Sequence, residues 1–186
     1  MELTNADFYS IDTNIITRLN ALFTERAPEI LRKDCDGIVM LKKADKVYFI
    51  LCELKSTFDS ADLYKAMHQI VSSYIKLNMV LNLLDGYNSK DCVYRGLIVS
   101  LPLEDNSSYA LELKNRLLLP DTQRYKKDSI WAAELFCNRG STLKATECEK
   151  LNGIPLSPSC LFDELEFHYI DTHGSNFVSI DITSYL

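Results

Sequence analysis

Apolar and charged positions come in blocks between Asp36 and Lys55, and this stretch predicts a β-hairpin. Residues 37–41 are apolar, residues 42–46 form a charged turn, and residues 47–54 are rich in β-forming residues and apolar on both faces. A strand that is apolar on both faces is typical of the middle of a sheet. Because a hairpin brings the start of its first strand beside the end of its second, we expect the two ends of this stretch to meet.

Further periodic stretches predict two helices and another strand. Apolar residues recur at helical spacing over residues 12–25 and 61–84, and Asp59 or Ser60 can cap the second helix. Residues 94–101 form an apolar run that would extend the sheet beside the second hairpin strand.

The C-terminal part of the chain is predicted to add a separate β-hairpin. Residues 161–169 and 177–185 have the pattern of strands, joined by a turn at residues 173–176. Before them, residues 109–118 are predicted to form a short helix and residues 130–137 a buried strand or helix segment. The added hairpin would cover an edge of the sheet or dock a partner.

Composition indicates one domain and predicts a cytoplasmic protein. The chain has 186 residues, of which 47% are hydrophobic, enough for a full core. We interpret residues 1–186 as a single domain, with its core over residues 12–101 and an extension over residues 102–186. No apolar run is long enough for a membrane span, and no signal peptide is visible. Six cysteines without a C-x-x-C pair indicate reduced thiols.

The polar residues at the ends of the predicted hairpin are Asp36, Glu53 and Lys55. Side chains alternate along a strand, so Glu53 and Lys55 are expected to point the same way and Leu54 back into the core. Two carboxylates and an ammonium at the edge of a buried sheet are costly without partners. Carboxylate oxygens suit Mg²⁺ or Mn²⁺ as the cofactor, and the lysine can orient a water or stabilise a phosphate. This combination predicts phosphodiester hydrolysis.

The same residues carry a family resemblance. Asp36 and Gly37 open a strand, an apolar strand ends in Glu53-Leu54-Lys55, and an amphipathic helix follows. This arrangement resembles the PD-(D/E)XK nuclease superfamily over about residues 28–101. One departure is that Cys35, and not a proline, precedes Asp36. The resemblance implies an α/β restriction-endonuclease-like fold, a mixed β-sheet core flanked by helices. It also implies Mg²⁺- or Mn²⁺-dependent cleavage of DNA, in restriction, anti-phage defence or repair.

Neighbouring elements supply further candidate residues through the resemblance. Some family members carry a Gln followed four residues later by a Tyr on the helix after the hairpin, whereas Tyr74 follows Gln69 by five. Because one extra residue turns a side chain by about 100° around a helix, we assign Gln69 to the site and Tyr74 to the core. Glu29 is a candidate metal ligand, with a solvated carboxylate as the alternative. His68 is interpreted as a surface residue.

Basic residues are the candidate contacts to a phosphate backbone. Arg124, Lys126 and Lys127 belong to the most basic stretch of the chain, for which a solvated loop is the alternative interpretation. A polar stripe on the long helix borders its apolar face and could look across the mouth of the site. That stripe consists of Lys65, Gln69, Ser72 and Lys76.

The charge balance argues against a nuclease that grips DNA alone. The formal net charge is −6, whereas proteins that bind nucleic acid tightly show a basic footprint. Either a local basic strip suffices, or a protein partner or second copy of the chain holds the nucleic acid. Two alternatives stay open: a catalytically silent binding or assembly subunit with this fold, and an immunity protein whose acidic surface mimics nucleic acid.

Overall fold

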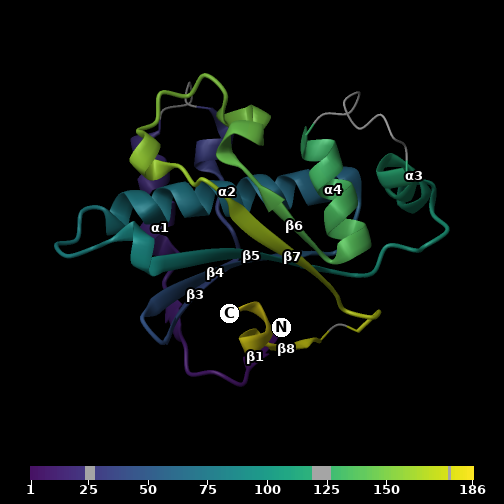
Figure 1. The fold of residues 1–186 in the computed structure, drawn as a ribbon, viewed down its shortest axis with the longest axis horizontal. Coiled ribbons are helices and arrows are strands. Elements are labelled where there is room, and N and C mark those ends of the chain that lie inside the picture. Colours follow the sequence, from purple (N-terminus) through teal and green to yellow (C-terminus); the bar gives the residue numbers. More distant parts are fainter. Residues whose placement is uncertain (24–27, 119–126, 176) are drawn as a thin grey trace.

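A six-stranded mixed sheet organises the fold, which we describe from a computed structural model for residues 1–23, 28–118, 127–175 and 177–186. The strand order is β2-β3-β4-β5-β7-β6, and a second, two-stranded parallel sheet pairs β1 with β8 (Figure 1). The strands are β1 (Glu2–Thr4), β2 (Tyr9–Ile11), β3 (Gly37–Lys43), β4 (Lys46–Lys55), β5 (Cys92–Ser100), β6 (Gly140–Leu143), β7 (Leu165–Asp171) and β8 (Ser179–Asp181).

Helices pack mainly on one face of the large sheet, and the small sheet lies on the other (Figure 1). The α-helices are α1 (Asn14–Thr17), α2 (Ser60–Leu81), α3 (Ser108–Leu118) and α4 (Lys127–Asn138). The 3-10 helices are η1 (Arg18–Leu22), η2 (Glu29–Arg32), η3 (Ser89–Asp91), η5 (Ala145–Glu147), η6 (Glu149–Leu151), η7 (Pro158–Cys160) and η8 (Ile182–Tyr185). The general α/β class is thus confirmed. None of the helices within these ranges has the length and apolar character needed to cross a bilayer.

The predicted hairpin is confirmed as β3 and β4, which are antiparallel from the Gly37–Cys52 pair to the Lys43–Lys46 pair. On its other side β4 runs parallel to β5, so it lies in the middle of the sheet, as its two apolar faces indicated. Phe49 and Leu51 belong to the core under α2, whereas Ile50 and Cys52 pack in the smaller cluster on the opposite face. Burial on both faces therefore sets the position of β4.

The first helix is shorter and tighter than predicted. In place of one helix over residues 12–25, the chain forms α1 and the 3-10 helix η1, and Phe23 is already extended. Ile16 is the buried residue of α1, and η1 has none. Because helices in proteins are stabilised mostly by packing an apolar face, this segment lacks the contacts for a longer helix. The second predicted helix is confirmed as α2, and the Asp59 carboxylate caps it by accepting from Asp62 N at 2.8 Å.

The predicted C-terminal hairpin is wrong. Strand β7 enters the large sheet between β5 and β6, parallel to β5, while β8 pairs with β1. The apolar pattern indicated strands here, but the second is only the short β8, and Ile182–Tyr185 form η8 instead. The pattern did not show the partners of either strand, because partners are chosen by burial between distant segments. Strands β6 and β7 therefore complete the central sheet, although both lie beyond residues 12–101. The segment at residues 130–137, left open between strand and helix, belongs to α4.

Gly96 shows how closely β7 packs under the helices. A Cβ atom at this position would lie 2.8 Å and 2.9 Å from ring carbons of Phe167 and 3.1 Å from a methyl of Ile70. Because Phe167 is fully buried, its ring has little room to move. We expect Gly96→Ala to lower the free energy of unfolding by about 1–3 kcal/mol, the usual effect of overpacking.

Urea unfolding of Gly96→Ala beside Gly140→Ala tests this expectation. At Gly140 the added Cβ would meet its nearest atom at 3.5 Å, an ordinary contact, so this variant controls for replacing a strand glycine. If the two variants unfolded at the same urea concentration, the close packing of β7 against β5 would be contradicted.

Candidate functional site

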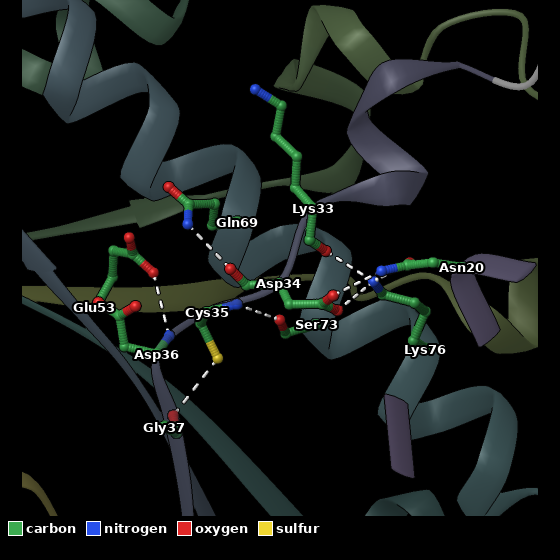
Figure 2. Close-up of polar contacts among 10 residues, drawn as sticks. All are labelled: Asn20, Lys33, Asp34, Cys35, Asp36, Gly37, Glu53, Gln69, Ser73 and Lys76. Atoms are coloured by element: carbon green, nitrogen blue, oxygen red, sulfur yellow. Dashed lines mark hydrogen bonds and ion pairs between the residues drawn. The ribbon is translucent and has the colours of Figure 1, made fainter. Parts of the chain in front are cut away.

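The start of β3 and the end of β4 bring Asp36 and Glu53 together, as the sequence predicted. The backbone N–H of Asp36 donates to Oε2 of Glu53 at 3.2 Å, and the N–H of Leu54 donates to Oδ2 of Asp36 at 2.8 Å. Each carboxylate is thus held by the other strand's backbone (Figure 2 shows the Glu53 contact). This exchange fixes where both carboxylates lie relative to the hairpin.

Lys55 completes the group through its ammonium. Its Nζ lies 2.5 Å from Oε1 of Glu53 and donates to Oε1 of Gln69 at 2.8 Å. The Glu53 side chain is 1% exposed and that of Lys55 10%. Burial raises the pKa of Glu53 above its usual range, and the nearby Asp36 charge adds to this, while the hydrogen bond from Lys55 opposes it. The ion pair therefore helps to keep a buried carboxylate ionised.

Gln69 joins the site from α2, as expected from the resemblance. Its Nε2 donates to the carbonyl oxygen of Asp34 at 2.9 Å (Figure 2). Because its Oε1 accepts from Lys55, both ends of the amide are engaged. The Tyr74 side chain is buried and contacts the rings of Tyr94 and Phe162 edge-on, which confirms its assignment to the core. The spacing argument thus separated two polar residues of one helix correctly.

Leu54 and His68 lie differently from their predictions. Leu54 is 45% exposed, because the end of β4 extends beyond the small cluster that covers this face of the sheet. His68 is half-buried, not a surface residue. Burial lowers the pKa of His68 to about 4, and the positive charges of Lys33 and Lys150 contribute. His68 is therefore neutral near pH 7 and does not add to the charge of the site.

Two carboxylates are the donors that this site offers to a divalent cation. Among the residues that the structure describes, no group of three or more His, Cys, Asp or Glu residues is placed to hold a metal. Mg²⁺ is commonly bound by one or two carboxylates with several waters, so Asp36 and Glu53 fit that ion. A cation at Oε1 of Glu53 would have to displace the ammonium of Lys55, which contacts that oxygen.

Glu29 does not join these carboxylates. It lies on η2 with its side chain 72% exposed, and its Oε1 pairs with Lys33 Nζ at 2.8 Å. Within the part of the chain that the structure describes, the prediction of Glu29 as a metal ligand is therefore wrong. Its exposure agrees with the alternative interpretation, a solvated carboxylate. The cause is local, because the turn at η2 buries Ile30 and Leu31 and leaves Glu29 outside.

The candidate nucleic-acid contacts have different outcomes. Lys65 is exposed on α2, and Lys127 is exposed at the start of α4, where its Nζ lies 4.0 Å from Glu147 Oε1. Arg124 and Lys126 lie outside the described residues, so their part in a basic strip stays a prediction.

Lys76 was predicted to lie on the polar stripe that borders the apolar face of the long helix and could look across the mouth of the site, and it is instead fully buried. Its Nζ donates to Asn20 Oδ1 at 2.8 Å and to the carbonyl oxygen of Lys33 at 2.6 Å, and it pairs with Asp34 (Figure 2). Burial lowers the pKa of Lys76, while the hydrogen bond that Lys76 donates to Asp34 and the negative charge of Asp34 act in the opposite direction.

Sequence reasoning missed Asp34, Asn20 and Ser73, which accompany Lys76. Ser73 Oγ accepts from the N–H of Cys35 at 2.8 Å, and Asn20 Nδ2 donates to Oδ2 of Asp34 at 2.7 Å. A signal was present, because Gln69, Ser73 and Lys76 follow one another at i, i+4 and i+7 spacing and therefore share one side of α2.

No family model, no curated protein and no solved structure matches this chain. The resemblance of the motif to PD-(D/E)XK nucleases therefore stays an expectation from the sequence.

Proposed function

We propose that this chain is a Mg²⁺- or Mn²⁺-dependent nuclease of the PD-(D/E)XK type that hydrolyses phosphodiester bonds in DNA. One observation carries the proposal: the start of β3, the end of β4 and the middle of α2 bring Asp36, Glu53, Lys55 and Gln69 into one hydrogen-bonded group. Two neighbouring carboxylates can hold a divalent cation, and a lysine beside them can stabilise negative charge on a phosphate, a combination that suits metal-assisted phosphodiester hydrolysis.

Each residue has a distinct part in the proposed reaction. Asp36 and Glu53 would hold the divalent cation, which supplies positive charge at the phosphate and makes a bound water more acidic. Lys55 would donate to a phosphate oxygen or orient the attacking water once its ammonium leaves Glu53. Gln69 accepts from Lys55 and so restricts where the ammonium can lie.

The acidic balance of the chain bears on its partners. With a formal net charge of −6, a long contact with DNA would need positive charge from another source. We therefore propose that a protein partner or a second copy of the chain helps to hold the DNA. Roles in restriction, anti-phage defence or repair follow from the family analogy alone.

A second candidate function is a binding or assembly subunit that has kept the fold without the chemistry. The Lys55–Glu53 contact favours it, because the ammonium engages an oxygen that a catalytic metal would use. This candidate predicts that neither Mg²⁺ nor Mn²⁺ binds at the carboxylates and that DNA stays intact.

Incubation with supercoiled plasmid and with single-stranded DNA separates the two candidates. With Mg²⁺ or Mn²⁺ we expect cleavage that a chelator abolishes. Asp36→Asn should remove the activity, and Asp105→Asn is the matched control, because Asp105 is an exposed aspartate paired with Lys114 at 3.0 Å. Cleavage that persists in Asp36→Asn would trace to a contaminant, and intact DNA under every condition would favour the silent subunit.

A further inference from the structure

One stripe of α2 anchors the chain segment that leads into Asp36. Ser73 accepts from the N–H of Cys35 at 2.8 Å, and Gln69 donates to the carbonyl oxygen of Asp34 at 2.9 Å. Lys76 pairs with the Asp34 carboxylate. Successive residues before β3 are therefore attached to one face of α2 (Figure 2). We call the three α2 residues that make these contacts, Gln69, Ser73 and Lys76, the polar clamp.

The deepest part of the polar clamp is a closed set of charged and polar partners. The three protons of the Lys76 ammonium match three acceptors, on Asn20, Lys33 and Asp34. The two oxygens of Asp34 accept separately, one from Lys76 and one from Asn20. The set joins η1, the segment before β3 and α2, which are distant in sequence.

Stability alone does not explain a buried ion pair of this kind. Well-packed apolar residues of similar volume often stabilise a fold as well or better, whereas a satisfied polar network selects one arrangement of the backbone. Here the selected backbone is that of residues 33–36. The next N–H, that of Asp36, donates to Glu53, and the Gln69 amide that holds Asp34 also accepts from Lys55.

We propose that Ser73 and Lys76 are positioning residues for the candidate metal site, acting through the segment at Asp34 and Cys35 on Asp36 and through Gln69 on Lys55. This inference rests on the proposed nuclease function. Neither residue is assigned contact with metal or DNA, because Ser73 Oγ is engaged by the N–H of Cys35 and the Lys76 ammonium by Asn20, Lys33 and Asp34.

Two neighbouring serines provide a matched test. Ser72 and Ser73 are both fully buried on α2, but among the described residues the Ser72 hydroxyl has no hydrogen-bond partner. Ser73→Ala removes the acceptor for Cys35 N–H, whereas Ser72→Ala removes a hydroxyl that anchors nothing. We expect Ser73→Ala to weaken Mn²⁺ binding by about tenfold, as is typical of residues that orient metal ligands, and Ser72→Ala to leave it unchanged.

The readouts are calorimetric titration with Mn²⁺ and the NMR signal of the Gln69 side-chain amide. That signal should move in Ser73→Ala and stay in place in Ser72→Ala, because only the former loosens the segment to which Gln69 is bonded. The double variant Asp34→Asn/Lys76→Met, which leaves no buried charge unpaired, should fold and also shift the Gln69 signal. Titrating Mn²⁺ only into variants that are folded separates weaker metal binding caused by lost positioning from weaker binding caused by unfolding.

The outcomes distinguish this inference from the proposal beneath it. Suppose that the wild type binds Mn²⁺ and cleaves DNA and that both serine variants bind Mn²⁺ as tightly as the wild type. The positioning role of Ser73 is then overturned, and the proposed nuclease function stands. If the wild type binds no Mn²⁺ at all, the proposed function fails, and with it any role of the polar clamp in holding metal ligands.

Discussion

Lys76→Met is expected to lower the free energy of unfolding by about 3 kcal/mol, the lower end of what breaking a buried ion pair removes. Methionine fills a similar volume but leaves the Asp34 carboxylate without its cation. The Asp34 side chain is 17% exposed, so water relieves part of this penalty. Two acceptors, on Asn20 and on the carbonyl of Lys33, also lose their donor. Urea unfolding followed by circular dichroism measures the change.

Two comparison variants show whether the loss comes from the unpaired charge. Lys114→Met removes a partly exposed lysine that pairs with Asp105 and lies 6.0 Å from the centroid of the Phe136 ring, and it should change stability by less than about 1 kcal/mol. Asp34→Asn/Lys76→Met should recover part of the loss, since the remaining amide carries no charge. A single Lys76→Met variant as stable as the wild type would mean that the buried ion pair does not form.

Lys55→Met is expected to reduce DNA cleavage by about 10²–10⁴-fold, the range for a group that transfers or positions a proton. Its stability should also fall, by about 1–3 kcal/mol, because Glu53 is left buried without its closest donor. From its position at a strand end alone, loss of Lys55 would be expected to leave stability nearly intact, and the structure changes that expectation. The 2.5 Å contact with a 1% exposed carboxylate is the reason for the change.

Metal binding should respond to Lys55→Met in the opposite direction. Without the ammonium at Oε1 of Glu53, Mn²⁺ meets no competitor there, so the Mn²⁺-dependent rise in melting temperature should be retained or larger. Glu53→Gln and Asp36→Asn should lose that rise, because an amide is a weaker metal ligand than a carboxylate. Melting curves with and without Mn²⁺ for the wild type and the three variants measure this. No shift in the wild type, with destabilised carboxylate variants, would make Asp36 and Glu53 structural ion-pair residues.

The hairpin and the core of the site could be read from local pattern. Residues 37–54 are apolar in two blocks separated by a charged turn, and such a block pattern specifies strand, turn and strand regardless of the rest of the chain. Once the hairpin is assumed, Asp36 must lie near Glu53, since antiparallel pairing leaves no other choice. The family resemblance suggested Gln69 as a site residue, and helical spacing assigned Tyr74 to the core, because the angle between the two side chains depends only on positions within one helix.

The partners of the outer strands could not be read in this way. The alternation of residues 165–171 shows a strand with one buried face, but any strand with a compatible face could accept it. Its place beside β5 depends on Gly96, whose missing side chain makes room for Phe167. That fit joins residues far apart in the chain, and no short window of sequence contains both.

The sequence by itself therefore determined the elements whose geometry is local: the hairpin, the long helix and the carboxylates with Lys55 at the hairpin ends. Only the tertiary structure decided which polar residues are buried. Lys76 looks like any lysine bordering an apolar helix face, and it is fully buried because Asp34, Asn20 and the carbonyl of Lys33 surround its ammonium. Removing a charge from water is unfavourable unless partners are supplied, and those partners come from separate segments that folding alone brings together.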